Sequence, residues 1–137
     1  MIEKTLVIIK PDGVMKGVVR DIENRYVDHG LRVVREQRRV MEKTLVEQFY
    51  QEHARKFFFE GLVLSMISGA VVIFILEGED AIKKVRALNG ATDPAKAELG
   101  TIRHDFRSAG GPFNTVHGSD GPEAAAREIA LIFGATY

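Results

Sequence analysis

Two spacings of hydrophobic residues divide this chain into segments. Runs rich in β-branched and aliphatic residues predict strands, and apolar residues spaced three or four apart predict amphipathic helices. The strands are expected at residues 4–10, 31–40 and 70–76, with a fourth closing at Thr115–Val116. The helices are expected at 15–26, ended by Gly30, at 44–67 as a helical region resembling a hairpin, at 80–89 and at 123–133. The order is βαβ, a helical region, and βαβ again.

This order predicts an α/β (α+β) protein with a ferredoxin-like split βαβ fold, in which helices cover a four-stranded antiparallel sheet. Segments 5–10 and 70–76 are apolar throughout and are expected to be the central strands, whereas the other two are shorter or more polar. Helices are expected on one face of the sheet. The 137 residues fit a single domain, 1–137, with a core of its own.

The strand at 31–40 interleaves arginines with apolar residues, which indicates an edge strand or a contact between subunits. Acidic residues at Asp28, Glu36 and Glu42 flank these arginines and disfavour a nucleic-acid stripe. The whole chain has 19 basic and 19 acidic residues and thus no global charge that would favour nucleic acid or an acidic membrane. Nucleic acid is therefore not expected as the main partner.

Composition excludes several other classes. The chain has no cysteine, which rules out disulfides, zinc–thiolate sites and iron–sulfur clusters. The apolar run at 70–76 is far shorter than the roughly 20 residues that span a bilayer. Residues 1–4 lead into a strand without the pattern of a signal peptide, so a soluble cytoplasmic protein without membrane partners is expected.

Local signals mark several segment ends. Pro11-Asp12-Gly13 is typical of a turn and makes Lys10 the expected last residue of the first strand. Thr44 with Glu47, and Asp120 with Glu123, have the spacing of helix capping boxes. The stretch 90–112 lacks clear periodicity, and a loop of this length is usually functional or disordered. Its threonines and arginines suit anion binding.

At His117, the pattern predicts the end of a strand and the start of a helix. Backbone N–H groups at such a position favour phosphate oxygens, and Gly118 permits the close approach of a ligand or another backbone. In the last helix, Glu128 falls on the same stripe as Ala125 and Ile132. An inward carboxylate needs a partner. That partner is either an imidazole N–H, which would leave the other ring nitrogen as a nucleophile, or some arginine.

Common nucleotide-binding fingerprints are absent from the sequence, which has neither a P-loop nor a Gly-x-Gly-x-x-Gly after a strand. What remains is His117, a strand-end lysine at position 10, and arginines 86 and 103 on either side of the long loop. Cations that converge on one nucleophile form a coherent set for phosphoryl transfer. Each residue taken alone also has a structural interpretation, and a run such as Phe57–Phe59 is more often part of a core than a platform for a base.

Spaced motifs then identify a family. Asn114-x-x-His117-Gly118-Ser119-Asp120 resembles the signature of the nucleoside diphosphate kinases. Further family features follow in order along nearly the whole chain: Lys10-Pro11-Asp12-Gly13, Tyr50, Phe58, Arg86-x3-Gly90-x-Thr92-x-Pro94 and Gly100-Thr101-x-Arg103-x-Asp105-Phe106. The resemblance implies transfer of the γ-phosphate of a nucleoside triphosphate to a nucleoside diphosphate, by a ping-pong mechanism through a phosphohistidine at His117.

The resemblance also assigns expected roles. Glu128 and Ser119 would orient and assist the histidine, with Lys10 and Tyr50 also in the catalytic set. Phosphate and sugar contacts are expected from Lys10, Tyr50, Arg86, Thr92, Arg103 and Asn114, and base contacts from Phe58 with Leu62 nearby. Magnesium would arrive on the nucleotide phosphates rather than at a metal site of the protein, and the chain is expected to form a homo-oligomer, either a tetramer or a hexamer.

Four positions depart from the usual family pattern, namely Phe57, Ala70, Leu99 and His104. None carries a catalytic assignment, but the departures at Leu99 and His104 bear on the rigidity of the long loop and on subunit packing. Two rival functions stay open at this point. One is a ferredoxin-like module that binds nucleotide or nucleic acid without turnover, and the other is a phosphorelay protein.

Overall fold

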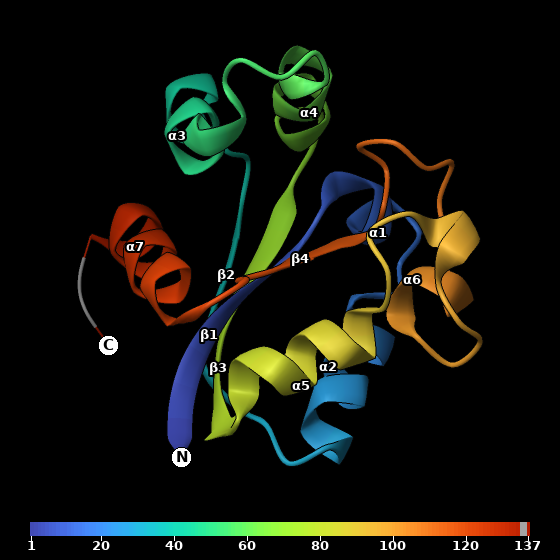
Figure 1. Cartoon of the computed structure of the whole chain (residues 1–137), viewed down its shortest axis with the longest axis vertical. Helices are drawn as coiled ribbons and strands as arrows, with labels where there is room; N and C mark the ends of the chain where they lie inside the picture. The colour runs from blue at the N-terminus through green and yellow to red at the C-terminus, as the bar shows by residue number, and fades with distance from the viewer. Residues whose placement is uncertain (135–136) are drawn as a thin grey trace.

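The computed structural model describes residues 1–134 and 137, and its core is a four-stranded antiparallel sheet (Figure 1). The spatial order is β2-β3-β1-β4, as the ferredoxin-like prediction requires. The strands are β1 (Ile2–Ile9), β2 (Arg32–Arg39), β3 (Val71–Glu79) and β4 (Val116–Gly118). The predicted central pair, β1 and β3, is confirmed, and β2 is confirmed as an edge strand.

Two of the four predicted helical segments, 80–89 and 123–133, agree with the structure to within one residue, and the other two, 15–26 and 44–67, each correspond to two helices. The helices are α1 (Pro11–Met15), α2 (Val19–Asp28), α3 (Lys43–Phe49), α4 (Phe59–Met66), α5 (Ala81–Asn89), α6 (Ile102–Asp105) and α7 (Pro122–Phe133), with 3₁₀ turns at Gln51–His53 and Pro94–Lys96. The predicted helical hairpin corresponds to α3 and α4, and α7 ends at Gly134 in the left-handed conformation.

Helices cover both faces of the sheet, so the expectation of a single covered face was wrong. On β1, Leu6 and Ile8 pack in one core cluster with residues of α3, α4 and α7. Val7 and Ile9 point the other way and pack in a second cluster with α2, α5 and α6. Successive side chains of a strand alternate between faces, and a strand that is apolar on both faces needs a hydrophobic layer on each. Figure 1 shows α7, α3 and α4 on one side and α2 and α5 on the other.

The first strand ends one residue earlier than predicted, and the segment after it is helical. Lys10 is the N-cap residue of α1, and Pro11 occupies the first helical position, where its missing N–H costs nothing. Gly17, at φ +73°, then separates α1 from α2. Met15 is exposed rather than part of the inward stripe because α1 and α2 are two helices with different faces.

Both predicted capping boxes were wrong. Helix α3 begins after Glu42 and α7 begins after Gly121, and neither N-cap residue makes a side-chain cap hydrogen bond. The side-chain caps lie instead in the long loop. Asp93 accepts from the Ala95 N–H, and the Thr101 hydroxyl accepts from the His104 N–H. These caps, a 3₁₀ turn and α6 give the stretch 90–112 local structure that its lack of periodicity concealed.

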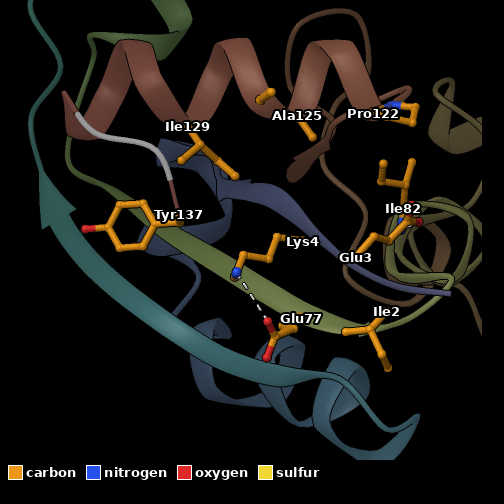
Figure 2. Close-up of a pocket in the computed structure, with 10 residues that line it drawn as sticks. Ile2, Glu3, Lys4, Glu77, Ile82, Pro122, Ala125, Ile129 and Tyr137 are labelled. Carbon is orange, nitrogen blue, oxygen red and sulfur yellow. Dashed lines mark hydrogen bonds and ion pairs between the residues drawn. The ribbon is translucent and has the colours of Figure 1, made fainter.

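At the beginning of β1, the sheet and α7 leave a small cavity of about 270 Å³ (Figure 2). Its two central charged groups satisfy each other, since Lys4 Nζ lies 3.4 Å from a carboxylate oxygen of Glu77. The far larger cavity described next lies at the opposite end of β1. Within residues 1–134 and 137, no helix is long and apolar enough to cross a membrane.

Candidate active site

A cavity of about 690 Å³ opens beyond the end of β1, between the α3–α4 hairpin, the long loop and β4. It brings together residues that are far apart in the sequence. Every residue predicted for the site lines it except Ser119: Lys10, Tyr50, Phe58, Leu62, Arg86, Thr92, Arg103, Asn114, His117 and Glu128. Ser119 is fully buried directly behind the cavity wall, where it contacts Glu128.

His117 lies within β4, opposite Ile8 of β1, and not at the start of a helix as predicted. Helix α7 begins only at Pro122. The residue before β4, Thr115, has φ 74°, an uncommon conformation for a β-branched residue. Its N–H donates to Asp12 Oδ2 at 3.0 Å, and its hydroxyl donates to the Phe106 carbonyl at 2.9 Å. These contacts fix the backbone that carries the histidine.

The partner of Glu128 is the imidazole, which decides between the two alternatives left open by the sequence. His117 Nε2 lies 3.0 Å from Glu128 Oε1, and the Ser119 hydroxyl donates to the same oxygen at 2.6 Å. An arginine, Arg127, lies farther away, at 3.8 Å from the other oxygen. Burial alone raises the pKa of Glu128, but the hydrogen bond and charge of His117, with Ser119, outweigh it and hold the pKa below its usual range.

An ionised Glu128 is a hydrogen-bond acceptor only, so Nε2 of His117 must carry the proton that it shares with Oε1. The lone pair of the neutral ring then resides on Nδ1. Phe49 and Tyr50 further limit movement of the ring, which they meet edge-on with centroid distances of 5.0 and 6.1 Å. The geometry therefore prepares one specific nitrogen of His117 as a nucleophile.

Lys10 brings a buried ammonium to the same cavity. Its Nζ donates to Asn114 Oδ1 at 2.8 Å, and Asn114 Nδ2 donates to the Thr92 carbonyl at 3.1 Å. Burial, and next the charge of Arg103, lower the pKa of Lys10 to about 8, against a smaller opposing effect of Asp12. Burial makes the charged form of Lys10 energetically costly. An anion that enters the cavity offsets this cost and stabilises the protonated lysine.

Arg103 combines a structural and an electrostatic role. Its guanidinium donates to three backbone carbonyls, those of Gly90, Asn114 and Val116, at 2.8 to 3.2 Å. This clamps the start of the long loop to the segment that leads into His117. Burial is the main reason that the pKa of Arg103 is lowered. Among the described residues, Arg86 makes one long hydrogen bond, 3.4 Å to the Gly118 carbonyl, and thus retains donors for a ligand.

The Tyr50 hydroxyl is buried and has no hydrogen-bond partner among the described residues. Burial raises the pKa of this hydroxyl, with a smaller contribution from the charge of Glu128, and keeps it protonated. A buried hydroxyl that faces the cavity without a partner among the described residues is suited to contact a bound ligand. On the wall beyond Tyr50, Phe58 and Leu62 supply an apolar surface.

Sequence reasoning missed several residues of the cavity. Phe49 forms part of the ring cluster around His117, and Glu52, His53, Phe57 and Asp120 line the cavity. Asp12 does not line the cavity but accepts a hydrogen bond from the backbone N–H of Thr115. The Lys10-Pro11-Asp12-Gly13 motif contains this residue. The motif was interpreted as a turn, and a turn does not predict a partner for the Asp12 carboxylate far away in the sequence. Phe57 was noted as a departure from the family pattern and as part of Phe57–Phe59, which was interpreted as core more than as a platform for a base.

Comparison with known proteins supports the same assignment over the whole fold. The family model described as nucleoside diphosphate kinase matches residues 3–137. A nucleoside diphosphate kinase from Burkholderia thailandensis is 52% identical over 132 residues, which cover 96% of this chain and 93% of that protein.

Solved structures agree. The Aquifex aeolicus nucleoside diphosphate kinase is 38% identical, with a TM-score of 0.93 and coverage of 97% of this chain and 96% of that one. A halophilic nucleoside diphosphate kinase from Halobacterium salinarum in complex with CDP is 42% identical, with a TM-score of 0.93 and coverage of 98% and 90%. The chain therefore belongs to the nucleoside diphosphate kinase family, enzymes that transfer the γ-phosphate of a nucleoside triphosphate to a nucleoside diphosphate through a phosphohistidine.

Proposed function

We propose that His117 carries the phosphate between the two nucleotides. The observation behind this proposal is the 3.0 Å contact between Nε2 and Glu128, which leaves the lone pair on Nδ1. Nδ1 attacks the γ-phosphorus, the bond from that phosphorus to the bridging oxygen breaks, and the nucleoside diphosphate leaves with the electron pair. A terminal oxygen of a second nucleoside diphosphate then attacks the phosphorus, and the N–P bond breaks.

Glu128 and Ser119 act as positioning residues in this proposal. As Nδ1 bonds to phosphorus, the ring gains positive charge, which the ionised carboxylate at Nε2 stabilises. The Ser119 hydroxyl keeps that carboxylate in place through its 2.6 Å hydrogen bond. Both residues therefore assist the formation and the breakdown of the phosphohistidine without contacting the nucleotide.

The phosphates and the sugar are bound by the polar wall of the cavity. Lys10, Arg86 and Arg103 neutralise the charge that the transferred phosphoryl group carries, and Tyr50, Thr92 and Asn114 supply hydrogen bonds. The base rests on Phe58 beside Leu62. Stacking without contacts to base edges tolerates purines and pyrimidines alike, because every base has a π-face.

Magnesium enters as part of the substrate, bridging the phosphates of the bound nucleotide. Mg²⁺ retains several waters and needs few protein ligands in such complexes. The cavity supports this mode because three of its lining residues, Lys10, Arg86 and Arg103, are cations that match phosphates. Its buried carboxylate, Glu128, is already engaged by His117 and Ser119.

We also propose that residues 1–137 form one domain, that the protein acts in the cytoplasm, where its nucleotide substrates are found, and that it assembles as a homo-oligomer, a tetramer or a hexamer. Strand β2 supports assembly because it is an edge of the sheet, where backbone N–H and C=O groups can pair with another chain. Light scattering on the purified protein gives the number of subunits directly.

The central experiment separates the two half-reactions. The protein is incubated with γ-labelled ATP and Mg²⁺, freed of nucleotide, tested for acid-labile phosphate and then mixed with GDP. We expect label on the wild-type protein and its transfer to GTP. His117→Ala should lose the label but keep GDP binding, whereas the control His29→Ala, at the exposed end of α2, should retain both steps. Label on the His117→Ala protein would refute the assignment.

A further inference from the structure

A series of aromatic rings runs from the proposed nucleophile outward. His117 meets Tyr50 at a centroid distance of 6.1 Å, Tyr50 meets His53 at 6.4 Å, and His53 meets Phe58 at 5.5 Å. Phe57 ends the series, 5.6 Å from Phe58 with an interplanar angle of 83°. All five side chains line the same cavity.

Exposure rises along this series from Tyr50 outward. Tyr50 is 6% exposed, Phe58 is 39% exposed and Phe57 is 99% exposed. The series therefore leads from the half-buried His117 to the mouth of the cavity, where Phe57 lies. Because the phosphates are placed at His117, a nucleotide that lies along the cavity brings its base to the outer rings.

Phe58 offers only part of its ring to a base. His53 and Phe57 pack against it, and Lys56 Nζ lies 5.7 Å from its centroid. Phe57, in contrast, has both faces free within the described part of the chain. The two phenylalanine rings are nearly perpendicular, so a base that stacks on one ring meets the other at its side.

Phe57 also differs from the other strongly exposed apolar residues. Leu99 and Met15 are exposed singly and do not line the cavity, as is common on protein surfaces. Phe57 is continuous with the partly exposed face of Phe58 and with Leu62 and so extends an apolar wall that a ligand uses. No core packing accounts for its position.

We propose that Phe57 is a specificity-determining residue that contacts purine bases and favours ADP and GDP over CDP and UDP. The inference rests on the proposed function, in which the base lies against Phe58. A pyrimidine ring is small enough to be covered by the free part of Phe58 alone. A purine has a second fused ring, which extends beyond Phe58 and gains the additional surface of Phe57.

Equilibrium binding tests the inference without requiring turnover. Dissociation constants of GDP and CDP are measured by titration calorimetry for the wild type and for Phe57→Ala, Phe57→Leu and Phe57→Tyr. We expect Phe57→Ala to weaken GDP binding about fivefold, near the lower limit for loss of a base–aromatic contact, and CDP binding less than about twofold. Phe57→Tyr should restore GDP binding, and Phe57→Leu should restore it only in part.

Met15→Ala is the matched control, since it removes an exposed apolar side chain outside the cavity and should leave both constants unchanged. Equal losses for GDP and CDP, or no loss for either, would overturn the inference. So would a change of oligomeric state in Phe57→Ala with an unchanged ratio of the two constants, because Phe57 would then be a subunit contact. If the wild type binds GDP and is not phosphorylated by ATP, only the proposed function fails.

Discussion

Nε2 of His117 and Oε1 of Glu128 lie 3.0 Å apart, although one residue belongs to a strand and the other to the helix that follows it. The pair forms because β4 presents the imidazole toward the face of the sheet that α7 covers. Ser119, in the connection between the two elements, donates to the same oxygen. One carboxylate oxygen therefore fixes both the tautomer and the orientation of the ring.

Replacement of Glu128 should slow phosphorylation without abolishing it. In Glu128→Ala the ring loses both its orienting acceptor and the negative charge that stabilises it in the transition state. We expect the single-turnover rate of phosphorylation by ATP to fall about 10- to 100-fold, which corresponds to roughly 1.4–2.8 kcal/mol in the activation free energy. A rate within about twofold of the wild type would contradict the positioning role.

Ser119→Ala provides a graded comparison with that variant. It removes a single hydrogen bond to Glu128 and leaves the carboxylate and its contact with His117 in place. The rate of phosphorylation should therefore fall by less than in Glu128→Ala, and the double variant should be no slower than Glu128→Ala alone, because Ser119 acts through Glu128. Additive losses measured in this cycle would show that the serine acts on its own.

Activity should decline above about pH 8 as Lys10 loses its proton. The pKa of Lys10 is lowered to about 8, mainly because of burial. Since kcat/KM reports the ionisation of the free enzyme, its pH profile should fall on the alkaline side near this value. Lys10→Arg keeps a positive charge throughout this range, so its remaining activity should show no such fall. An identical alkaline limb in both proteins would exclude Lys10 as its source.

The deprotonation of Lys10 should also make the free energy of unfolding depend on pH. Lys10 has a folded-state pKa of about 8 and an ordinary value of 10.5, so between these pH values the unfolded chain binds more protons. Stability therefore rises with pH in this window, and below about pH 8 the buried charge costs about 3 kcal/mol. The free energy of unfolding of Lys10→Met, measured with urea, should lose its advantage over the wild type between pH 8 and 10. A constant difference would contradict this linkage.

Much of the fold follows from the hydrophobic pattern. The runs that become β1 and β3 are apolar on both faces and are correctly placed at the centre, and the arginine-rich β2 is correctly placed at the edge. Residues whose roles depend on tertiary contacts were harder to predict. The carboxylate of Asp12 looks like a turn signal, yet its oxygen binds the N–H of Thr115, far away in the sequence.

The site, too, contains some features that the sequence predicts and others that depend on tertiary contacts. Glu128 is predicted to face inward from helical spacing alone, but spacing does not distinguish a histidine partner from an arginine. The distances settle that point. The placement of His117 at a helix start was wrong because the histidine belongs to β4, and Ser119–Gly121 separates that strand from α7. The three carbonyl contacts of Arg103 link the end of α5 to β4 and the segment before it, and no local pattern predicts them.

Asn114 should matter for both stability and nucleotide binding because it connects Lys10 to Thr92. Asn114→Leu removes the acceptor of a buried ammonium and should lower the free energy of unfolding by about 1–3 kcal/mol. Asn114→Asp instead gives Lys10 an ionic partner but adds a negative charge beside the phosphates. Its stability should thus exceed that of Asn114→Leu, while its KM for nucleoside diphosphates should rise. Equal stability of the two variants would contradict this account.

Gly118 should not tolerate even a methyl group. A Cβ at this position would lie 2.9 Å from both Asn89 Nδ2 and Val85 Cγ1, so β4 meets α5 at its backbone. Gly118→Ala should therefore push β4 and His117 away from α5, lower the free energy of unfolding by about 1–3 kcal/mol and slow phosphorylation. The matched control is Gly61→Ala within α4, where a Cβ has no neighbour within 4 Å and helix propensity should add about 0.5–1 kcal/mol. If urea denaturation ranked the two variants in the opposite order, the close contact between β4 and α5 would be refuted.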